Sequence, residues 1–336
     1  MNRIYVVFVF FLGITVTDSG WAQSLKGAFP ISAAQKIVFL GNSITYAGHY
    51  VTLFESFMIT AFPKATTQVI NLGLPSETVS GLSEDGHANG AFIRPCLFNR
   101  LENITERMTP DIVFACYGMN DGIYQPFSDS NFQRYKEGMI ALYKRLKAAQ
   151  IKRIIFITPS IHEDTVLGFH GYNLVLDRYA QWLLDQRRER NWEVIDTHFP
   201  MQKYVIAKKR LEPNFKLSED GIHPGLEGHC LIAECIIHYF DDTFAAKDFL
   251  SECLDSTSYY AHLYTLLEVR QEIQKNAWLT YTKHERPGLP VGLPIDKAKK
   301  ESMRIQNKIQ KLQKTSHKRR NYEISDHHLP TSLTIY

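Results

Sequence analysis

The chain has 336 residues, of which 44% are hydrophobic, and carries a formal net charge of +3. This length and apolar content predict one α/β domain of ordinary size with an appendage. The nearly balanced charge gives no reason to expect binding to nucleic acid or to an anionic membrane. Five cysteines without C-x-x-C spacing argue against a zinc site and a dense disulfide framework, and leave the pairing of a single disulfide open.

The first residues have the pattern of a secretory signal peptide. Arg3 supplies a positive charge, the stretch 4–16 is almost wholly apolar, and Gly20 and Ala22 occupy the two positions that a signal peptidase reads. The apolar stretch is shorter than the roughly 20 residues that span a bilayer, which favours a cleaved peptide over an uncleaved anchor. We therefore predict a signal peptide over 1–22, export to the periplasm or the extracellular space, and no membrane span in the mature protein.

Five short apolar runs, rich in β-branched residues, are each followed by Gly, Pro, Asn or Asp and then by a longer segment of helical period. They lie at 37–40, 68–72, 112–117, 153–158 and 192–196. Strands that are apolar throughout and separated by helices predict a parallel sheet covered by helices on both faces.

The alternation of strands and helices stops near residue 241. The stretch 259–280 has a helical pattern, and a Pro- and Gly-rich connection joins it to a second helical pattern over 295–314. The last residues, including the basic run 318–320, are polar, and we expect them to be frayed. The predicted organisation is therefore a domain over 23–240 and a helical extension over 241–336.

Glycine and polar residues follow the predicted strands, and in an open parallel α/β sheet ligands bind outside these carboxyl ends. Gly41, Asn42 and Ser43 follow the first strand, ahead of a helical pattern that begins near Gly48. A serine at such a turn lies beside outward-pointing N–H groups that stabilise developing negative charge. A small polar turn also follows many strands for structural reasons alone, so the rest of the chain must decide.

Acyl transfer from a serine requires a base, a group that orients the base, and hydrogen-bond donors for the oxyanion. Ser43 can be the nucleophile, His223 the base and Asp220 the orienting group. The donors would be the backbone N–H groups of Ser43 and Gly73 and the side-chain amide of Asn120. This chemistry needs no cofactor and no metal, and no His, Asp or Glu cluster has metal-ligand spacing. No dinucleotide-binding or phosphate-loop motif follows a strand.

Four short segments, GNSIT, the glycine of NLGLPSET, YGMND and DGIHP, resemble the four sequence blocks of the SGNH hydrolases, which include the GDSL esterases and lipases. The resemblance covers residues 36–240. It implies that the family's Ser, Gly, Asn and His correspond to Ser43, Gly73, Asn120 and His223. The aspartate of the family's DxxH motif corresponds to Asp220. Asn42 replaces the aspartate of the GDS version of the first block, which weakens the likeness to the lipase branch more than the case for catalysis.

The predicted fold is a three-layer α/β/α sandwich with a five-stranded parallel, flavodoxin-like sheet and a C-terminal helical extension. His87, Tyr124 and His162 fall in loops at the expected rim of the site and are candidate substrate contacts. For His87 and the nearby Arg94, a solvent-exposed loop is the alternative interpretation. Asp121 follows Asn120 directly, and we expect it to fix its loop by hydrogen bonding.

The resemblance implies a serine esterase that forms an acyl-enzyme. The whole chain looks most like exported bacterial SGNH proteins assigned to carbohydrate deacetylation, so we expect O-acetyl esters of carbohydrates, or another small-molecule or glycan ester, as the substrate. One alternative is a GDSL-type lipase or general carboxylesterase that acts on longer acyl chains. Another is a non-catalytic glycan-binding or scaffold protein that keeps the fold. The sequence does not predict an oligomeric state.

Overall fold

The computed structural model describes residues 29–163 and 171–326, with side chains up to residue 315. The predicted signal peptide, 1–22, lies outside the described residues and stays a prediction. None of the described helices combines the length and the apolar character needed to cross a membrane. All five cysteines lie in the described part of the chain, and each is a free thiol there.

One five-stranded parallel sheet forms the centre of the molecule, as the sequence predicts. Its spatial order is β2-β1-β3-β4-β5, which is the flavodoxin-like order. The strands are β1 (Lys36–Gly41), β2 (Gln68–Gly73), β3 (Ile112–Cys116), β4 (Arg153–Ile157) and β5 (Glu193–Ile195). Their apolar side chains are buried almost without exception because helices cover both faces.

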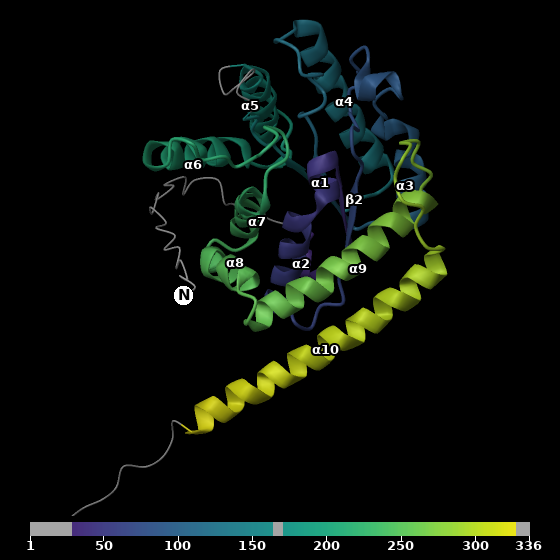
Figure 1. Cartoon of the computed structure of the whole chain (residues 1–336). Helices are drawn as coiled ribbons and strands as arrows, with labels where there is room; N and C mark the ends of the chain where they lie inside the picture. Colours follow the sequence, from purple (N-terminus) through teal and green to yellow (C-terminus); the bar gives the residue numbers. More distant parts are fainter. Residues whose placement is uncertain (1–28, 164–170, 327–336) are drawn as a thin grey trace, which may run out of the picture.

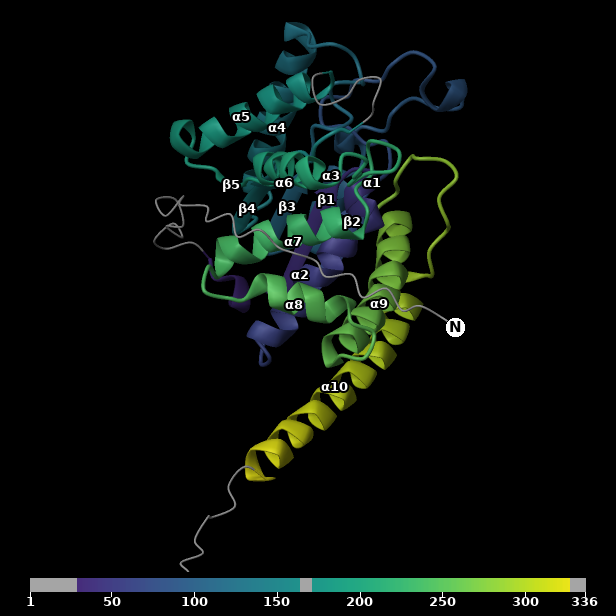
Figure 2. The ribbon, with the colours of Figure 1, turned by 60° about the vertical axis from the view of Figure 1, so that its left-hand side comes forward.

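Helices cover the two faces of this sheet, and Figure 2 shows α4 and α5 on one face and α2 and α7 on the other. The bounds are α1 (Ser43–Ala47), α2 (His49–Ala61), α3 (Leu101–Met108), α4 (Asp129–Ala148), α5 (Asn173–Glu189), α6 (His198–Leu211) and α7 (Leu226–Phe240). Three short 3-10 helices complete this part: η1 (Ile31–Ala33), η2 (His87–Gly90) and η3 (Leu97–Asn99). The predicted three-layer α/β/α sandwich is confirmed.

The C-terminal extension consists of α8 (Ala246–Leu254), α9 (Tyr259–Tyr281) and α10 (Ile295–Asp326). Both predicted helices are present, and α10 runs on through 318–320 because no Gly or Pro interrupts that stretch. The end of α10 projects away from the rest of the molecule (Figures 1 and 2). Side chains of α8 and α9, including Phe249 and Trp278, belong to the same hydrophobic core as the sheet. The extension therefore packs on the domain through α8 and α9, while a second, smaller hydrophobic cluster of Leu263, Leu267, Ile305 and Ile309 joins α9 to α10.

Helix α9 also contacts β2, which is an edge strand of the sheet. The side-chain amide of Gln271 donates to Val69 O at 2.8 Å, and its oxygen accepts from Asn71 N at 3.3 Å. These are backbone groups that a neighbouring strand would otherwise pair with. Gln271 thus pairs with two backbone groups at the outer edge of β2, as a neighbouring strand would.

Candidate active site

Ser43 is the first residue of α1, directly after the carboxyl end of β1. Asn42 caps this helix, because its side chain accepts a hydrogen bond from Ile44 N at 3.0 Å. The helix expected to begin near Gly48 is α2, which begins at His49. The structure adds the short α1 ahead of it, and Gly48, with a φ of 83°, ends α1 and allows the chain to turn into α2. The N–H of Ser43 lies at the helix start, where it has no intrahelical acceptor.

Ser43, His223 and Asp220 lie in one hydrogen-bonded row. His223 Nε2 is 2.7 Å from Ser43 Oγ, and His223 Nδ1 is 2.6 Å from Asp220 Oδ2. Because an ionised carboxylate only accepts hydrogen bonds, Nδ1–H donates to Asp220 and the lone pair of Nε2 faces the serine hydroxyl. This is the tautomer that can take a proton from Ser43.

The Asp220 carboxylate also accepts hydrogen bonds from its own loop, at 2.9 Å from Ile222 N and 2.7 Å from His223 N. Partial burial raises the pKa of Asp220, but the hydrogen bonds from the His223 side chain and from these two N–H groups outweigh burial and hold the pKa below its usual range. Asp220 therefore stays a carboxylate at neutral pH.

A buried glutamate anchors the loop that carries Asp220 and His223. Glu163 Oε2 accepts from Leu217 N at 2.8 Å and from Ser218 N at 2.7 Å, and Glu163 N donates to Gly221 O at 2.6 Å. The sequence gives no signal for this role, because these residues are more than 50 positions apart. Glu163 fixes the position from which His223 reaches Ser43.

Asn120 lies in the turn after β3 and is 3% exposed. Its Oδ1 accepts from the Tyr124 hydroxyl at 3.0 Å, and its Nδ2 donates to the carbonyl of Glu77 at 3.1 Å. One N–H of the amide remains for another acceptor. Because Gly41 pairs with Cys116 in the sheet, the turns that carry Ser43 and Asn120 leave neighbouring strands at the same edge.

Asp121 fixes this turn by hydrogen bonds, as predicted. Its Oδ1 accepts from Val79 N at 2.9 Å and Ser80 N at 2.8 Å, and its Oδ2 accepts from Gly118 N at 2.9 Å. Burial raises the pKa of Asp121 although these hydrogen bonds lower it. Asp121 therefore ties the segment after β2 to the turn after β3.

Gly73 does not present a free donor. Its N–H donates to Asn71 Oδ1 at 2.8 Å. A Cβ at this position would lie 2.2 Å from Tyr46 N, so a glycine is required because the end of β2 packs against α1. This close approach accounts for the glycine, and the predicted oxyanion role of Gly73 needs correction.

Ser76, three residues further on, presents a free N–H where Gly73 does not. Glu77 N donates to Leu74 O at 3.1 Å, and Ser76 has a φ of 69°. This is a turn of type II with Pro75 in its second position and Ser76 in the third, which normally needs a glycine or asparagine. Among the described residues, Ser76 N–H has no hydrogen-bond partner. The sequence offered a signal for this turn in Leu-Pro-Ser-Glu, because proline favours the second position of a type II turn.

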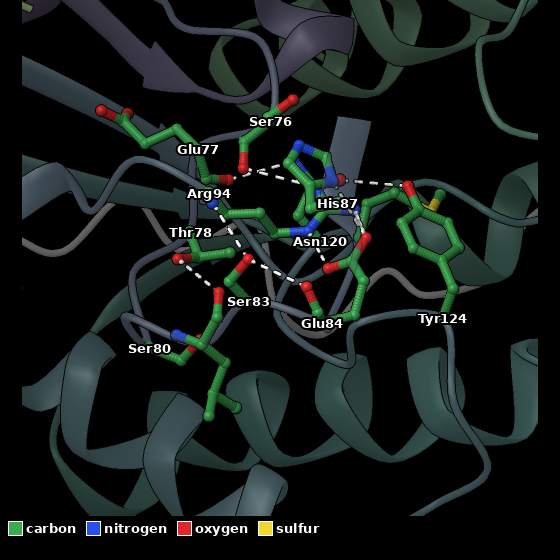
Figure 3. Close-up of polar contacts among 12 residues, drawn as sticks. Ser76, Glu77, Thr78, Ser80, Ser83, Glu84, His87, Arg94, Asn120 and Tyr124 are labelled. Carbon is green, nitrogen blue, oxygen red and sulfur yellow. Dashed lines mark hydrogen bonds and ion pairs between the residues drawn. The ribbon is translucent and has the colours of Figure 1, made fainter. Parts of the chain in front are cut away.

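Figure 3 shows the polar residues around Asn120. Arg94 is only 7% exposed and donates to both oxygens of Glu84 at 2.5 Å. His87 Nδ1 is 3.0 Å from Glu84 Oε1, and His87 Nε2 is buried without a hydrogen-bond partner in the described part of the chain. The backbone around His87 is solvent-exposed at 85–86 and 88–91, as the alternative interpretation expected. The side chains of His87 and Arg94 nevertheless join one polar network with Glu84.

The other two candidate substrate contacts are held by neighbouring side chains. The Tyr124 hydroxyl is used in the hydrogen bond to Asn120. His162 is 1% exposed, and its ring lies 5.9 Å from the ring of Tyr124 and 5.5 Å from that of Tyr172. Burial of His162 argues against direct contact with a substrate. Over the described residues, no group of three or more His, Cys, Asp or Glu side chains could hold a metal ion.

Comparison with known proteins places this geometry in context. The sequence model of the GDSL-like lipase/acylhydrolase family matches residues 39–231, which is more than half of the chain. No curated protein matches the sequence significantly.

Two solved structures are among those that this chain resembles. One is a gut microbial diltiazem-metabolizing enzyme, with a TM-score of 0.54 and 23% identity over 63% of this chain and 48% of that enzyme. This chain therefore spans about half the length of that enzyme. The other is Axe2, an acetylxylan esterase from Geobacillus stearothermophilus, with a TM-score of 0.48 and 21% identity over 63% of this chain and 95% of Axe2.

Proposed function

This chain belongs to the GDSL-like lipase/acylhydrolase family of ester-bond hydrolases, and from that premise we propose that it is a serine esterase with Ser43 as the nucleophile. The observation that carries the proposal is the row of hydrogen bonds from Ser43 Oγ to His223 Nε2, 2.7 Å, and from His223 Nδ1 to Asp220 Oδ2, 2.6 Å. A serine, a base and a group that orients the base are the parts that acyl transfer requires.

In the proposed mechanism, His223 Nε2 takes the proton of Ser43 Oγ as the oxygen attacks the ester carbonyl. The imidazolium then gives that proton to the leaving alcohol, and an acyl-enzyme remains on Ser43. Water, deprotonated by the same nitrogen, hydrolyses the acyl-enzyme and releases the acid. Asp220 holds the imidazole in the required tautomer and stabilises its positive charge.

The oxyanion of each tetrahedral intermediate needs donors that are not already used. We propose the N–H of Ser43, the remaining N–H of the Asn120 amide, and the N–H of Ser76 in place of that of Gly73. Ser76 precedes Glu77, whose carbonyl accepts from the Asn120 amide, so the two donors come from adjoining parts of the chain. Each such donor typically stabilises the transition state by about 3 kcal/mol.

A fluorophosphonate probe tests the proposed nucleophile directly. We expect one equivalent of probe to bind covalently to Ser43, because the Ser43 hydroxyl faces His223 Nε2 in the tautomer described above. Digestion and mass spectrometry of the labelled protein should place the probe on the peptide that contains GNSIT. The Ser43→Ala variant is the control and should take up no probe. A label on another serine would contradict the proposal.

We further propose that the substrates are O-acetyl esters of carbohydrates and that the protein meets them after export. The resemblance to exported deacetylating SGNH proteins supports this choice.

Chain-length preference distinguishes an acetyl esterase from a lipase or general carboxylesterase. Initial rates on chromogenic esters from acetate to octanoate are expected to be highest for acetate and to fall as the acyl chain lengthens. The purified wild-type protein and Ser43→Ala should be compared at each length, so that background hydrolysis is subtracted. Rates that rise steadily towards octanoate would exclude the acetyl preference while leaving the serine mechanism intact.

A further inference from the structure

Two consecutive residues next to the site, Ile123 and Tyr124, have left-handed backbone conformations, with φ values of 48° and 54°. For a β-branched residue such as isoleucine this conformation is a genuine outlier, and each such residue costs of order 1–3 kcal/mol. Strain of this size persists only where surrounding contacts hold it. Here it places the Tyr124 hydroxyl 3.0 Å from Oδ1 of Asn120, four residues earlier in the same turn.

The ring of Tyr124 is itself held by two neighbours. Its centroid lies 5.0 Å from that of Tyr172, with an angle of 21° between the planes, and Tyr172 donates to Met119 O at 2.8 Å. The Arg94 guanidinium lies over the Tyr124 ring, with Cζ 5.3 Å from the centroid. A planar guanidinium is well suited to this stacking.

Arg94 also contacts the chain at Ser76. Its Nη1 donates to Ser76 O at 3.4 Å, while Nε and Nη2 donate to Glu84. Glu84 therefore neutralises the guanidinium and occupies the edge that could bind a substrate carboxylate. Figure 3 shows Arg94 among Ser76, Glu84 and Asn120, with the Tyr124 hydroxyl directed at Asn120. Arg94 thus contacts Ser76, one proposed oxyanion donor, and also the ring of Tyr124. The Tyr124 hydroxyl in turn orients the amide of Asn120, another proposed donor.

We propose that Arg94 and Tyr124 are positioning residues of the oxyanion hole. Tyr124 fixes and polarises the Asn120 amide, because donation to Oδ1 strengthens the amide N–H as a donor. Arg94 holds the Tyr124 ring and the turn at Ser76 in a fixed position relative to each other. This inference rests on the proposed function, since it assigns Asn120 and Ser76 to the oxyanion. Neither Arg94 nor Tyr124 needs to touch the substrate.

The Tyr124→Phe variant keeps the ring under Arg94 and removes only the hydroxyl. We expect kcat for ester hydrolysis to fall about tenfold, the effect of one hydrogen bond of roughly 1–1.5 kcal/mol, with KM changed less than twofold. Affinity for a boronic acid, whose serine adduct places an oxygen in the oxyanion hole, should fall by a similar factor. Tyr143→Phe, a tyrosine of α4 that stacks on Trp192, is the matched control and should leave kcat unchanged.

The double-mutant cycle with Asn120→Ala decides between positioning and other roles. In the Asn120→Ala background, Tyr124→Phe should have no further effect on kcat, because the amide that it orients is absent. An equal loss of kcat in both backgrounds, or a change confined to KM, would overturn the inference. Arg94→Lys keeps the charge but loses the stacking and the paired hydrogen bonds, so kcat should fall. Because both side chains act on the same amide, kcat of the double variant with Tyr124→Phe should fall by less than the product of the two single losses.

Failure of this inference can be told apart from failure of the proposed function. If Ser43→Ala and Asn120→Ala abolish or strongly reduce hydrolysis while the Tyr124 and Asn120 effects multiply independently, only the positioning role is wrong. If Ser43→Ala hydrolyses esters at the wild-type rate, the proposed function itself is wrong. Urea unfolding of Tyr124→Phe and Arg94→Lys provides a check on folding, and a kcat loss that merely reflected unfolded protein would also count against the inference.

Discussion

Replacement of Ser43 by alanine is expected to lower kcat for ester hydrolysis by about 10⁶-fold, the size of effect found when a serine nucleophile is removed from a complete triad. The hydroxyl is the attacking group, and among the residues that the structure describes no other hydroxyl lies within hydrogen-bond distance of His223 Nε2. Initial rates on a chromogenic acetate, measured with protein in large excess of any contaminating esterase, check this result. Rates near the wild-type value would refute the serine mechanism.

The same substitution should leave the stability of the fold almost unchanged. The described hydrogen bond of Ser43 Oγ is to His223, whose side chain is 45% exposed and can bind water instead. Urea unfolding midpoints of the wild type and Ser43→Ala should agree closely. Ser251→Ala, at an exposed position of α8, is the matched control and should keep both full activity and full stability.

Substitution of Arg100 by methionine is expected to reduce the free energy of unfolding by about 3–5 kcal/mol, because it leaves a buried carboxylate without its partner. Arg100 and Glu77 are 2% and 0% exposed, and Arg100 Nε lies 2.6 Å from Glu77 Oε1. Arg100 Nη2 also donates to Leu72 O at 2.8 Å, so the substitution removes support from the end of β2. The Tyr117 hydroxyl, 2.7 Å from Glu77 Oε2, cannot replace a positive charge.

Urea unfolding measures this loss, and the exposed pair of Arg304 and Glu301 provides the control. These side chains are 61% and 38% exposed, so Arg304→Met should change the free energy of unfolding by less than about 1 kcal/mol. The double variant Glu77→Leu with Arg100→Met should regain part of the loss, since it buries no unpaired charge. A loss in Arg100→Met no larger than in Arg304→Met would contradict the prediction. If Arg100→Met alone failed to fold, the loss of stability would be even larger than predicted, and the prediction would stand.

The strands and their parallel direction could be predicted because each run is apolar from end to end, whereas their flavodoxin-like order was implied by the family resemblance. A strand buried on both faces shows no alternation, and β1, β3 and β4 are of this kind. The helix that begins at His49 was predicted, but the short α1 ahead of it was not. A cap at Asn42 starts α1, and a helix of five residues shows no periodic pattern in the sequence.

The candidate residues at strand ends could be proposed for a different reason: neighbouring parallel strands end at one edge. Of the residues that support them, Asp121 could be proposed because it is the sequence neighbour of Asn120, but Glu163 and the contacts of Arg94 could not. Glu163 binds a loop more than 50 residues away, and Arg94 reaches Ser76 and Tyr124 from a connection without regular structure. Such contacts depend on how loops pack in three dimensions. The Gly73 assignment went wrong because a glycine can serve close packing as well as hydrogen bonding.

The contact of Gln271 with the edge of β2 bears on how the protein avoids self-association. An unpaired edge strand offers its peptide groups to any other extended chain, and so invites intermolecular sheets and aggregation. Here the amide of Gln271 occupies Val69 O and Asn71 N, and α9 lies against the strand that contains them. A second polypeptide could extend the sheet at β2 only after α9 had been displaced. The C-terminal extension therefore covers that edge and blocks intermolecular strand pairing there.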